Sequence, residues 1–225
     1  MIQGNRNRFP CVVFIQIKIF AYVQKLLYLC SELEKKKYEM DIAVFASGTG
    51  TTLQTLIEKQ SKYGYHIAQV ITNRACQSTE RAISANIPSL ESKDWEIIDK
   101  TLEDKNIQLI VLAGFLAIIP QWMCEKWDKR IINIHPSLLP KHGGKGMYGI
   151  HVQEAVLQAQ DKEAGCTVHY VSANIDGGDI IAQSAIDVMP SDTPETLAQR
   201  VQQEEKKLLP HVIGDICKTL NKMSQ

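Results

Sequence analysis

The sequence predicts an α/β domain built on a doubly wound, mostly parallel sheet flanked by helices, with an antiparallel edge towards the C-terminus. From residue 40 onward, short apolar runs alternate with amphipathic stretches, the pattern that parallel strands and their connecting helices produce. The last two apolar runs, residues 167–171 and 180–188, are joined by a glycine-containing turn rather than by a helix, which predicts antiparallel pairing. The 225 residues, 44% hydrophobic and 22% charged, have the composition of an ordinary globular domain.

The strands and helices follow from this pattern in order. Residues 42–45 form the first apolar run, which ends in the glycine-rich turn S-G-T-G-T-T at 47–52. Leu53, Leu56 and Ile57 then recur at helical spacing, so we expect a helix directly after the turn. The further predicted strands are residues 66–72, 107–113 and 130–135, and the further predicted helices are residues 78–86, 94–105 and 148–160.

A long helix over residues 193–209 closes the predicted domain. Ser191 or Thr193 is expected to cap its N-terminus, because a hydroxyl oxygen can accept from the free N–H groups of the first turn. Glu195 lies in that first turn. Pro210 is expected to end the helix, because proline lacks the N–H that would continue the hydrogen-bond ladder.

Residues 1–39 differ from the rest of the chain. They hold seven Lys/Arg and three Asp/Glu, a net charge of +4 that leaves −4 for residues 40–225. Lys18 and Lys25 interrupt the apolar stretch, so no uncharged run reaches the ~20 residues that a membrane span needs. We expect an N-terminal extension that is not native or is poorly ordered, with a membrane-surface helix as an alternative, and a single catalytic domain over residues 40–225 beginning at Met40.

Charge and cysteine spacing limit the classes of partner. The formal net charge of the whole chain is zero, which argues against nucleic acid or an anionic membrane as a partner. The six cysteines form no Cys-x-x-Cys pair and no zinc-type cluster. We therefore expect reduced thiols in a cytoplasmic protein that needs no metal. Small-molecule substrates and a monomer or homodimer are further expectations, which do not follow from charge or cysteine spacing.

Two segments at predicted strand ends carry groups suited to chemistry. The glycine-rich turn at 47–52 can bind a phosphate through backbone N–H groups, or it can be a tight turn without a ligand. Asn133 and His135 are two residues apart on a strand and therefore face the same side. An amide donor beside an imidazole suits acyl transfer, although a structural histidine with an asparagine partner is the alternative. Asp176 could reach His135 and raise its pKa, or be an ordinary turn residue.

Four motifs in this order resemble the folate-dependent formyltransferases. They are I-A-V-F-A-S-G-T-G at 42–50, V-L-A-G-F-L at 111–116, N-I-H-P-S-L-L-P-K at 133–141 and N-I-D-G-G-D-I-I at 174–181. The resemblance covers residues 41 to about 214 and is nearest to the branch that acts on glycinamide ribonucleotide. It implies the fold of this family and transfer of a formyl group from 10-formyltetrahydrofolate, a cosubstrate, to the ribonucleotide amine in purine biosynthesis.

The resemblance also implies roles for individual residues. Asn133, His135 and Asp176 match the catalytic trio: His135 as general acid, Asn133 stabilising the oxyanion and Asp176 raising the pKa of His135. The implied ribonucleotide-binding residues are Gly50, Thr51, Thr52, Gln202, Gln203, Glu204 and Glu205. The implied folate-binding residues are Leu116, Ala117, Ile118, Ile119, Asn133, Ser172, Ala173, Asn174, Ile175 and Asp176.

The sequence departs from the family at several positions. Thr52 replaces a common asparagine, and Ala117 replaces a common arginine, so folate contacts there would be mainly to the backbone. Lys93 is the nearest match to a basic residue that reaches the folate in many members. The glycines of H-G-G-K-G-M-Y-G at 142–149 predict a mobile flap near the amine site, and Lys145 within it is expected to be solvated. Formyl transfer to another amine, such as an amino sugar nucleotide, and a non-catalytic folate-binding module remain open as alternatives.

Overall fold

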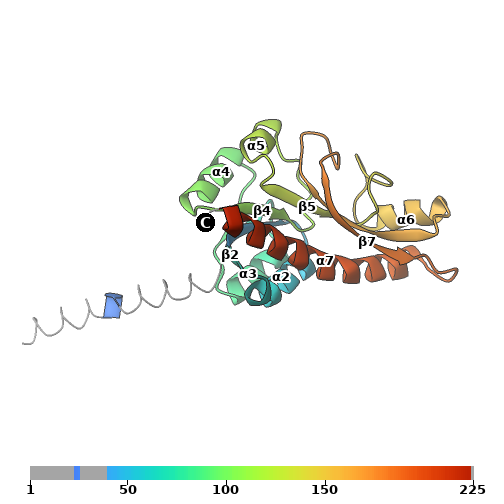
Figure 1. The fold of residues 1–225 in the computed structure, drawn as a ribbon, viewed down its shortest axis with the longest axis horizontal. Helices are drawn as coiled ribbons and strands as arrows, with labels where there is room; N and C mark the ends of the chain where they lie inside the picture. The colour runs from blue at the N-terminus through green and yellow to red at the C-terminus, as the bar shows by residue number, and fades with distance from the viewer. Residues whose placement is uncertain (1–22, 26–39, 224–225) are drawn as a thin grey trace, which may run out of the picture. The chain divides into compact units, whose positions relative to one another are not determined.

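The computed structural model of the protein describes residues 23–25 and 40–223. The chain divides into two units, Met1–Tyr38 and Glu39–Gln225, and the fold reported below is that of the second unit (Figure 1). The predicted N-terminal extension, residues 1–39, lies outside the described residues apart from residues 23–25.

Within the described part of the second unit, a seven-stranded sheet has the strand order β3-β2-β1-β4-β5-β6-β7. The strands are β1 (Met40–Ala46), β2 (Tyr65–Thr72), β3 (Ser89–Glu91), β4 (Leu109–Leu112), β5 (Ile131–His135), β6 (Glu163–Tyr170) and β7 (Ile180–Asp187). The pairs among β1 to β5 are parallel, whereas β5–β6 and β6–β7 are antiparallel. The predicted fold class is confirmed, including its antiparallel edge towards the C-terminus.

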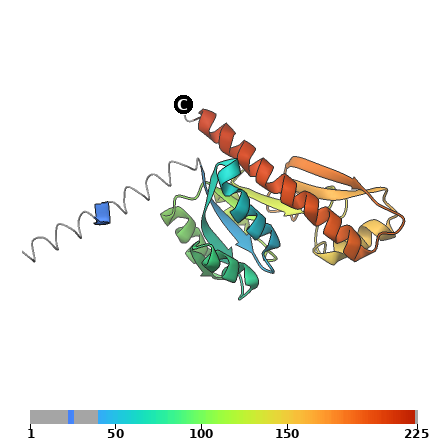
Figure 2. The same ribbon diagram turned by 90° about the horizontal axis from the view of Figure 1, so that it is seen from below.

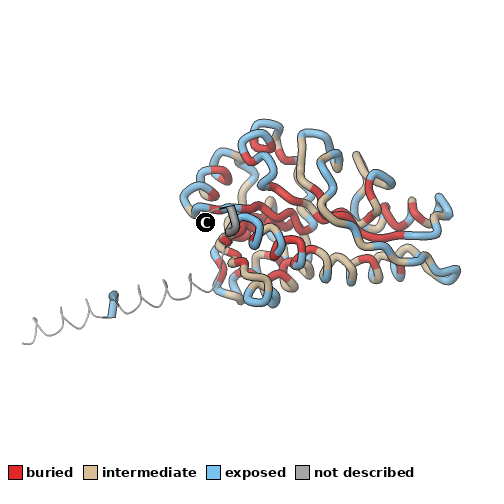
Figure 3. Tube along the Cα trace, in the orientation of Figure 1, coloured by how far each residue is buried: buried red, intermediate tan, exposed pale blue. Residues whose placement is uncertain are grey.

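Helices cover both faces of the sheet. They are α2 (Thr51–Tyr63), α3 (Gln77–Ser84), α4 (Trp95–Asp104), α5 (Gln121–Lys126), α6 (Ile150–Gln158) and α7 (Pro194–Met223). Because side chains alternate along a strand, Ile42 and Val44 of β1 pack with α2 and α7, whereas Ala43 and Phe45 pack with α4 and α5. Figure 3 shows the result as buried strands between helices whose outer faces are exposed.

The C-terminal helix corrects one prediction. Helix α7 does not end at Pro210 but continues through it to Met223. Proline removes one backbone hydrogen bond and costs roughly 3 kcal/mol in a helix interior. Beyond it, however, Val212, Ile213 and Cys217 are each at most 4% exposed, and burying such side chains stabilises by roughly 1.5–3 kcal/mol each. Packing therefore outweighs the lost bond, and α7 crosses the sheet as one helix (Figure 2).

Local signals at the other helix ends agree better with the structure. Thr193 is the predicted cap that is used, since its Oγ1 accepts from the N–H of Thr196 at 3.3 Å. The Asp94 side chain caps α4 by accepting from two backbone N–H groups. The sequence did not predict β3, a three-residue strand without buried residues, or α5, a six-residue helix. Both are too short to show a periodic pattern.

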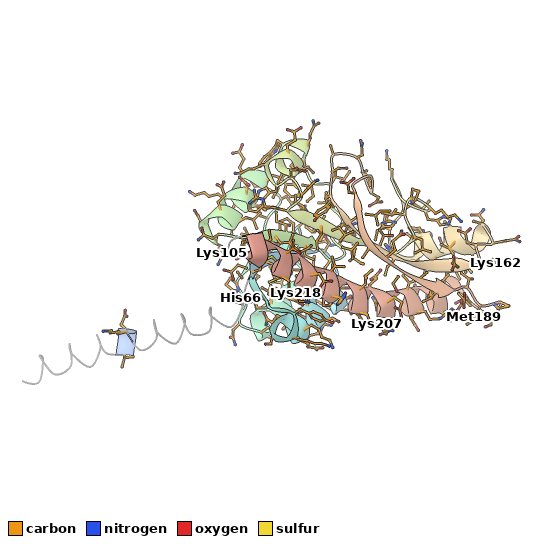
Figure 4. All side chains as sticks on the ribbon, in the orientation of Figure 1. His66, Lys105, Lys162, Met189, Lys207 and Lys218 are labelled. Carbon is orange, nitrogen blue, oxygen red and sulfur yellow. The ribbon has the colours of Figure 1, made fainter. Side chains whose placement is uncertain are left out.

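The packing beyond Pro210 can be tested by Ile213→Ala. Because Ile213 is fully buried against the sheet, the substitution should lower the free energy of unfolding by about 2–5 kcal/mol. The Lys218 side chain projects from the exposed side of the same helix (Figure 4). Lys218→Ala should therefore change the free energy of unfolding by less than ~0.5 kcal/mol. Urea unfolding measures both, and equal effects would contradict the assignment of this segment to the core.

Candidate active site

A cavity of about 660 Å³ lies at the carboxyl ends of the parallel strands, where doubly wound sheets bind their ligands. Its lining residues are 48–52, 112–119, 133–136, 144–150, 153, 169, 171–176, 198, 202 and 205. The turns after β1, β4 and β5 therefore meet there with a glycine-rich segment, the β6–β7 connection and one face of α7. The two segments that the sequence places at strand ends, the glycine-rich turn and Asn133–His135, share this one cavity.

The glycine-rich turn presents unpaired backbone donors to the cavity. Gly50 has φ +69°, and a Cβ there would lie 2.8 Å from Ser78 Oγ, so only glycine fits. Helix α2 starts at the next residue without a side-chain cap, which leaves the N–H groups of its first turn without a partner among the described residues. Arg74 and Arg81 each donate, from outside the cavity, to a carbonyl of the turn at 2.8 Å. The turn can therefore bind an anion through its N–H groups.

Asn133 lies opposite a histidine that the sequence analysis did not identify. Antiparallel pairing of β5 with β6 places Asn133 beside His169, and the Asn133 amide donates to His169 Nε2 at 3.1 Å. His169 Nδ1 donates to the Tyr170 carbonyl at 2.8 Å. Burial lowers the pKa of His169, which is 2% exposed, so its neutral form accepts this bond at pH 7. One amide N–H of Asn133 is thus held by His169, and the second is available to a ligand.

His135 and Asp176 form the centre of the site. His135 is 4% exposed; its Nε2 donates to the carbonyl of His142 at 2.9 Å, and its Nδ1 lies 3.6 Å from Asp176 Oδ2. Asp176 Oδ1 lies 3.7 Å from His169 Nε2. Both distances exceed those of hydrogen bonds. Asp176 Oδ2 accepts one hydrogen bond, from the Gly144 N–H at 2.9 Å. The Asp176 carboxylate therefore lies between the two imidazoles and faces Nδ1 of His135.

Helix α7 contributes two of the four residues that the sequence predicted there. Gln202 and Glu205 line the cavity, and Gln202 Nε2 donates to Thr51 Oγ1 at 3.3 Å. Gln203 and Glu204 do not line it, because helical residues three to four apart share a face and these two point elsewhere. Glu204 accepts from Ser184 Oγ at 3.0 Å instead. Burial raises the pKa of Glu205 to about 7.

All residues of the two predicted folate-binding segments, 116–119 and 172–176, line the cavity. Leu116, Ile118 and Ile175 are exposed apolar side chains at its rim. The buried Ser47 ties this wall to the glycine-rich turn, since its Oγ accepts from the Leu116 N–H at 3.0 Å. The arrangement gives a mainly apolar slot beside the His135–Asp176 pair, suited to a flat ring system.

The glycine-rich segment 144–150 forms a further wall. The glycines of residues 142–149 predict a flap near the site but no particular contact, whereas in the structure Gly144 donates directly to Asp176. Lys145 lines the cavity with an exposed side chain, and Lys93 does not line it. Neither His169 nor Gly144 could be assigned from the sequence, because both assignments depend on tertiary contacts. The cross-strand register of β5 and β6 is the signal that identifies His169.

Two features are absent from the part of the chain that the structure describes. No helix in residues 40–223 combines the length and apolar character needed to cross a membrane. The same part of the chain contains no group of three or more His, Cys, Asp or Glu side chains placed to hold a metal ion.

Comparison with known proteins identifies one family. The sequence profile of the formyl transferase family matches residues 40–213. The chain is 40% identical over 190 residues to a chloroplastic phosphoribosylglycinamide formyltransferase of Arabidopsis thaliana, covering 78% of this chain and 65% of that protein. It is 39% identical over 187 residues to the trifunctional purine biosynthetic protein adenosine-3 of Drosophila melanogaster, covering 77% of this chain and 14% of that protein. The chain thus spans less than two thirds of the length of either relative.

Solved structures are similar over the same region. A phosphoribosylglycinamide formyltransferase from Anaplasma phagocytophilum gives a TM-score of 0.75 at 36% identity, covering 80% of this chain and 88% of that one. Glycinamide ribonucleotide transformylase 1 from Symbiobacterium toebii gives 0.73 at 32% identity, again over 80% and 88%.

The raised pKa of Glu205 predicts a specific pH dependence of stability. Between the unfolded value of 4.5 and the folded value of about 7, the folded state binds the extra proton. The contribution of Glu205 to the free energy of unfolding therefore falls as the pH rises through this range. Glu205→Gln should lose less stability than the wild type between pH 5 and pH 8, by about 2 kcal/mol. Urea unfolding at both pH values measures the difference, and equal losses would contradict the buried titration.

Proposed function

The chain belongs to the formyl transferase family, and on this premise we propose that it transfers a formyl group from 10-formyltetrahydrofolate to the amine of glycinamide ribonucleotide, a reaction of purine biosynthesis. One observation carries the proposal: Asn133, His135 and Asp176 meet in a cavity that also contains an anion-binding turn. The names of the relatives from Arabidopsis and Anaplasma support the choice of acceptor.

The two ends of the cavity suit the two substrates. The phosphate of the ribonucleotide binds the free N–H groups of Gly50, Thr51 and Thr52, where the α2 dipole favours negative charge. Gln202 and Glu205 lie on the adjacent face of α7 and hydrogen-bond the sugar or the glycinamide. Glu205, which titrates near pH 7, can accept from a hydroxyl without a full charge being buried.

The folate ring system occupies the apolar slot between residues 116–119 and 172–176. Contacts there come mainly from backbone groups and apolar side chains, because Ala117 and Ile118 carry no donor. The slot ends beside Asp176, so the formyl-bearing nitrogen of a bound folate lies next to the His135–Asp176 pair. In this proposal, donor and acceptor lie on either side of the same catalytic groups.

The catalytic step forms a C–N bond between the amine and the formyl carbon and breaks the bond from that carbon to the folate nitrogen. As the amine attacks, the formyl oxygen gains negative charge, and the second N–H of Asn133 and the protonated His135 stabilise it. Asp176 stabilises the positive charge of His135 and takes up the proton that the amine loses, which then goes to the leaving folate nitrogen. No covalent enzyme intermediate is needed.

The direct test supplies both substrates and follows the release of tetrahydrofolate. The wild type should turn over, and His135→Ala should lower kcat by about 10²–10⁴-fold, because it removes the imidazole that stabilises the oxyanion and pairs with Asp176. His151→Ala, which changes a histidine with a 55% exposed side chain outside the cavity, is the control and should leave kcat unchanged. Absence of turnover, or turnover that is insensitive to His135→Ala, would overturn the proposal.

A second substitution separates catalysis from binding. Asp176→Asn keeps the shape of the side chain but removes its charge, so kcat should fall far more than the affinity for folate. Calorimetric binding of tetrahydrofolate to this variant provides the comparison. A loss of folate affinity as large as the loss in kcat would instead make Asp176 a structural residue.

A further inference from the structure

The segment of residues 141–144 contacts both members of the catalytic pair, His135 and Asp176, through its backbone. The carbonyl of His142 accepts from His135 Nε2 at 2.9 Å, and the N–H of Gly144 donates to Asp176 Oδ2 at 2.9 Å. These two backbone groups are only two residues apart. A shift of this segment would therefore move the hydrogen-bond partner of the imidazole and that of the carboxylate together.

The two glycines of this segment provide no side-chain anchor of their own. Gly143 and Gly144 contribute no side chain, and Gly144 has φ +93°. Gly143 lies so close to the site that a Cβ on it would be 3.4 Å from Asp176 Cβ. Glycine-rich backbone is costly to order, so its position must be fixed by neighbouring contacts.

Asp161, which follows α6, supplies those contacts. Its Oδ2 accepts from His142 Nε2 at 2.7 Å, and its Oδ1 accepts from Lys141 Nζ at 2.9 Å. The two carboxylate oxygens of Asp161 thus accept from two consecutive residues, Lys141 and His142, at the start of the segment. Ser137 Oγ adds a bond to the Lys141 carbonyl at 2.7 Å. The contacts to His142 and Lys141 hold the pKa of the Asp161 carboxyl below its usual value, so it is ionised at neutral pH.

Asp161 and His142 do not touch the space in which substrates bind. Neither lines the 660 Å³ cavity; both line a separate cavity of about 500 Å³ that also includes Lys162, labelled in Figure 4. The side chains of Asp161 and His142 are 17% and 16% exposed. Any effect of this pair on the reaction must therefore pass through the backbone of the segment.

We propose that Asp161, acting through His142, is a positioning residue that fixes the tautomer and orientation of His135 and the place of Asp176. The inference rests on the proposed function for its kinetic consequence. With the His142 carbonyl held in place, the Nε2–H of His135 always has its acceptor, and Nδ1 remains the nitrogen that exchanges a proton beside Asp176. Without the Asp161 contact, the carbonyl moves, and His135 populates both tautomers.

The kinetic test compares Asp161→Asn, Asp161→Glu and His142→Leu with the wild type. Asp161→Asn and His142→Leu should lower kcat by about 10–100-fold, the usual effect of losing an orienting partner, and change KM for either substrate less than threefold. Asp161→Glu keeps the charge and should recover part of kcat. The matched control is Glu154→Gln, which breaks the His151–Glu154 pair on α6, a histidine–carboxylate contact of 3.0 Å outside the cavity, and should leave kcat unchanged.

Nitrogen-15 NMR of histidine-labelled protein gives a readout that needs no turnover. The His135 signals, assigned by their loss in His135→Ala, should show a single tautomer protonated at Nε2 in the wild type and a mixture in Asp161→Asn and His142→Leu. A changed tautomer without any turnover in the wild type would support positioning and reject the proposed function. An unchanged tautomer together with unchanged kcat in both folded variants would overturn the positioning role.

Discussion

One buried carboxylate sets the requirements for the rest of the site. Asp176, with a side chain 10% exposed, lies within 3.7 Å of the imidazoles of His135 and His169. A carboxylate removed from water needs compensating partners. Burial keeps His169 neutral, so the groups that face the carboxylate as partners are the Gly144 N–H and the His135 imidazole. Asn133 is in turn oriented by the neutral His169, which lies on the other side of the same carboxylate.

The switch from parallel to antiparallel strands makes this arrangement possible. Parallel β1, β4 and β5 bring their carboxyl ends to one edge, where the anion-binding turn and Asn133 meet. Antiparallel β6 then runs back beside β5 and places His169 directly opposite Asn133, and the β6–β7 connection carries Asp176 over His135. If β6 ran parallel to β5, this pairing of Asn133 with His169 would be lost, and the Asn133 amide would have no imidazole acceptor. Helix α7 packs against both halves and contributes Glu205 to the cavity.

Features encoded in local chemistry could be predicted from the sequence, and features decided by tertiary contacts could not. Apolar runs and helical spacing gave the strands and helices, and the motif residues Asn133, His135 and Asp176 do lie together. Pro210 was expected to end a helix on backbone grounds, yet burial of the residues beyond it decides the outcome. The position of His169 depends on the cross-strand register of β5 and β6, and the contact of Asp161 with His142 depends on loop packing. Spacing along the chain reveals neither.

The central claim is that the cavity passes a formyl group directly from a folate to an amine. The most direct measurement supplies 10-formyltetrahydrofolate labelled with carbon-13 in the formyl group, together with glycinamide ribonucleotide, and locates the label by NMR and by mass spectrometry of the protein. The account predicts that all transferred label appears as the N-formyl group of the ribonucleotide, with one tetrahydrofolate released for each. Label found as free formate, or bound to the protein, would contradict direct transfer.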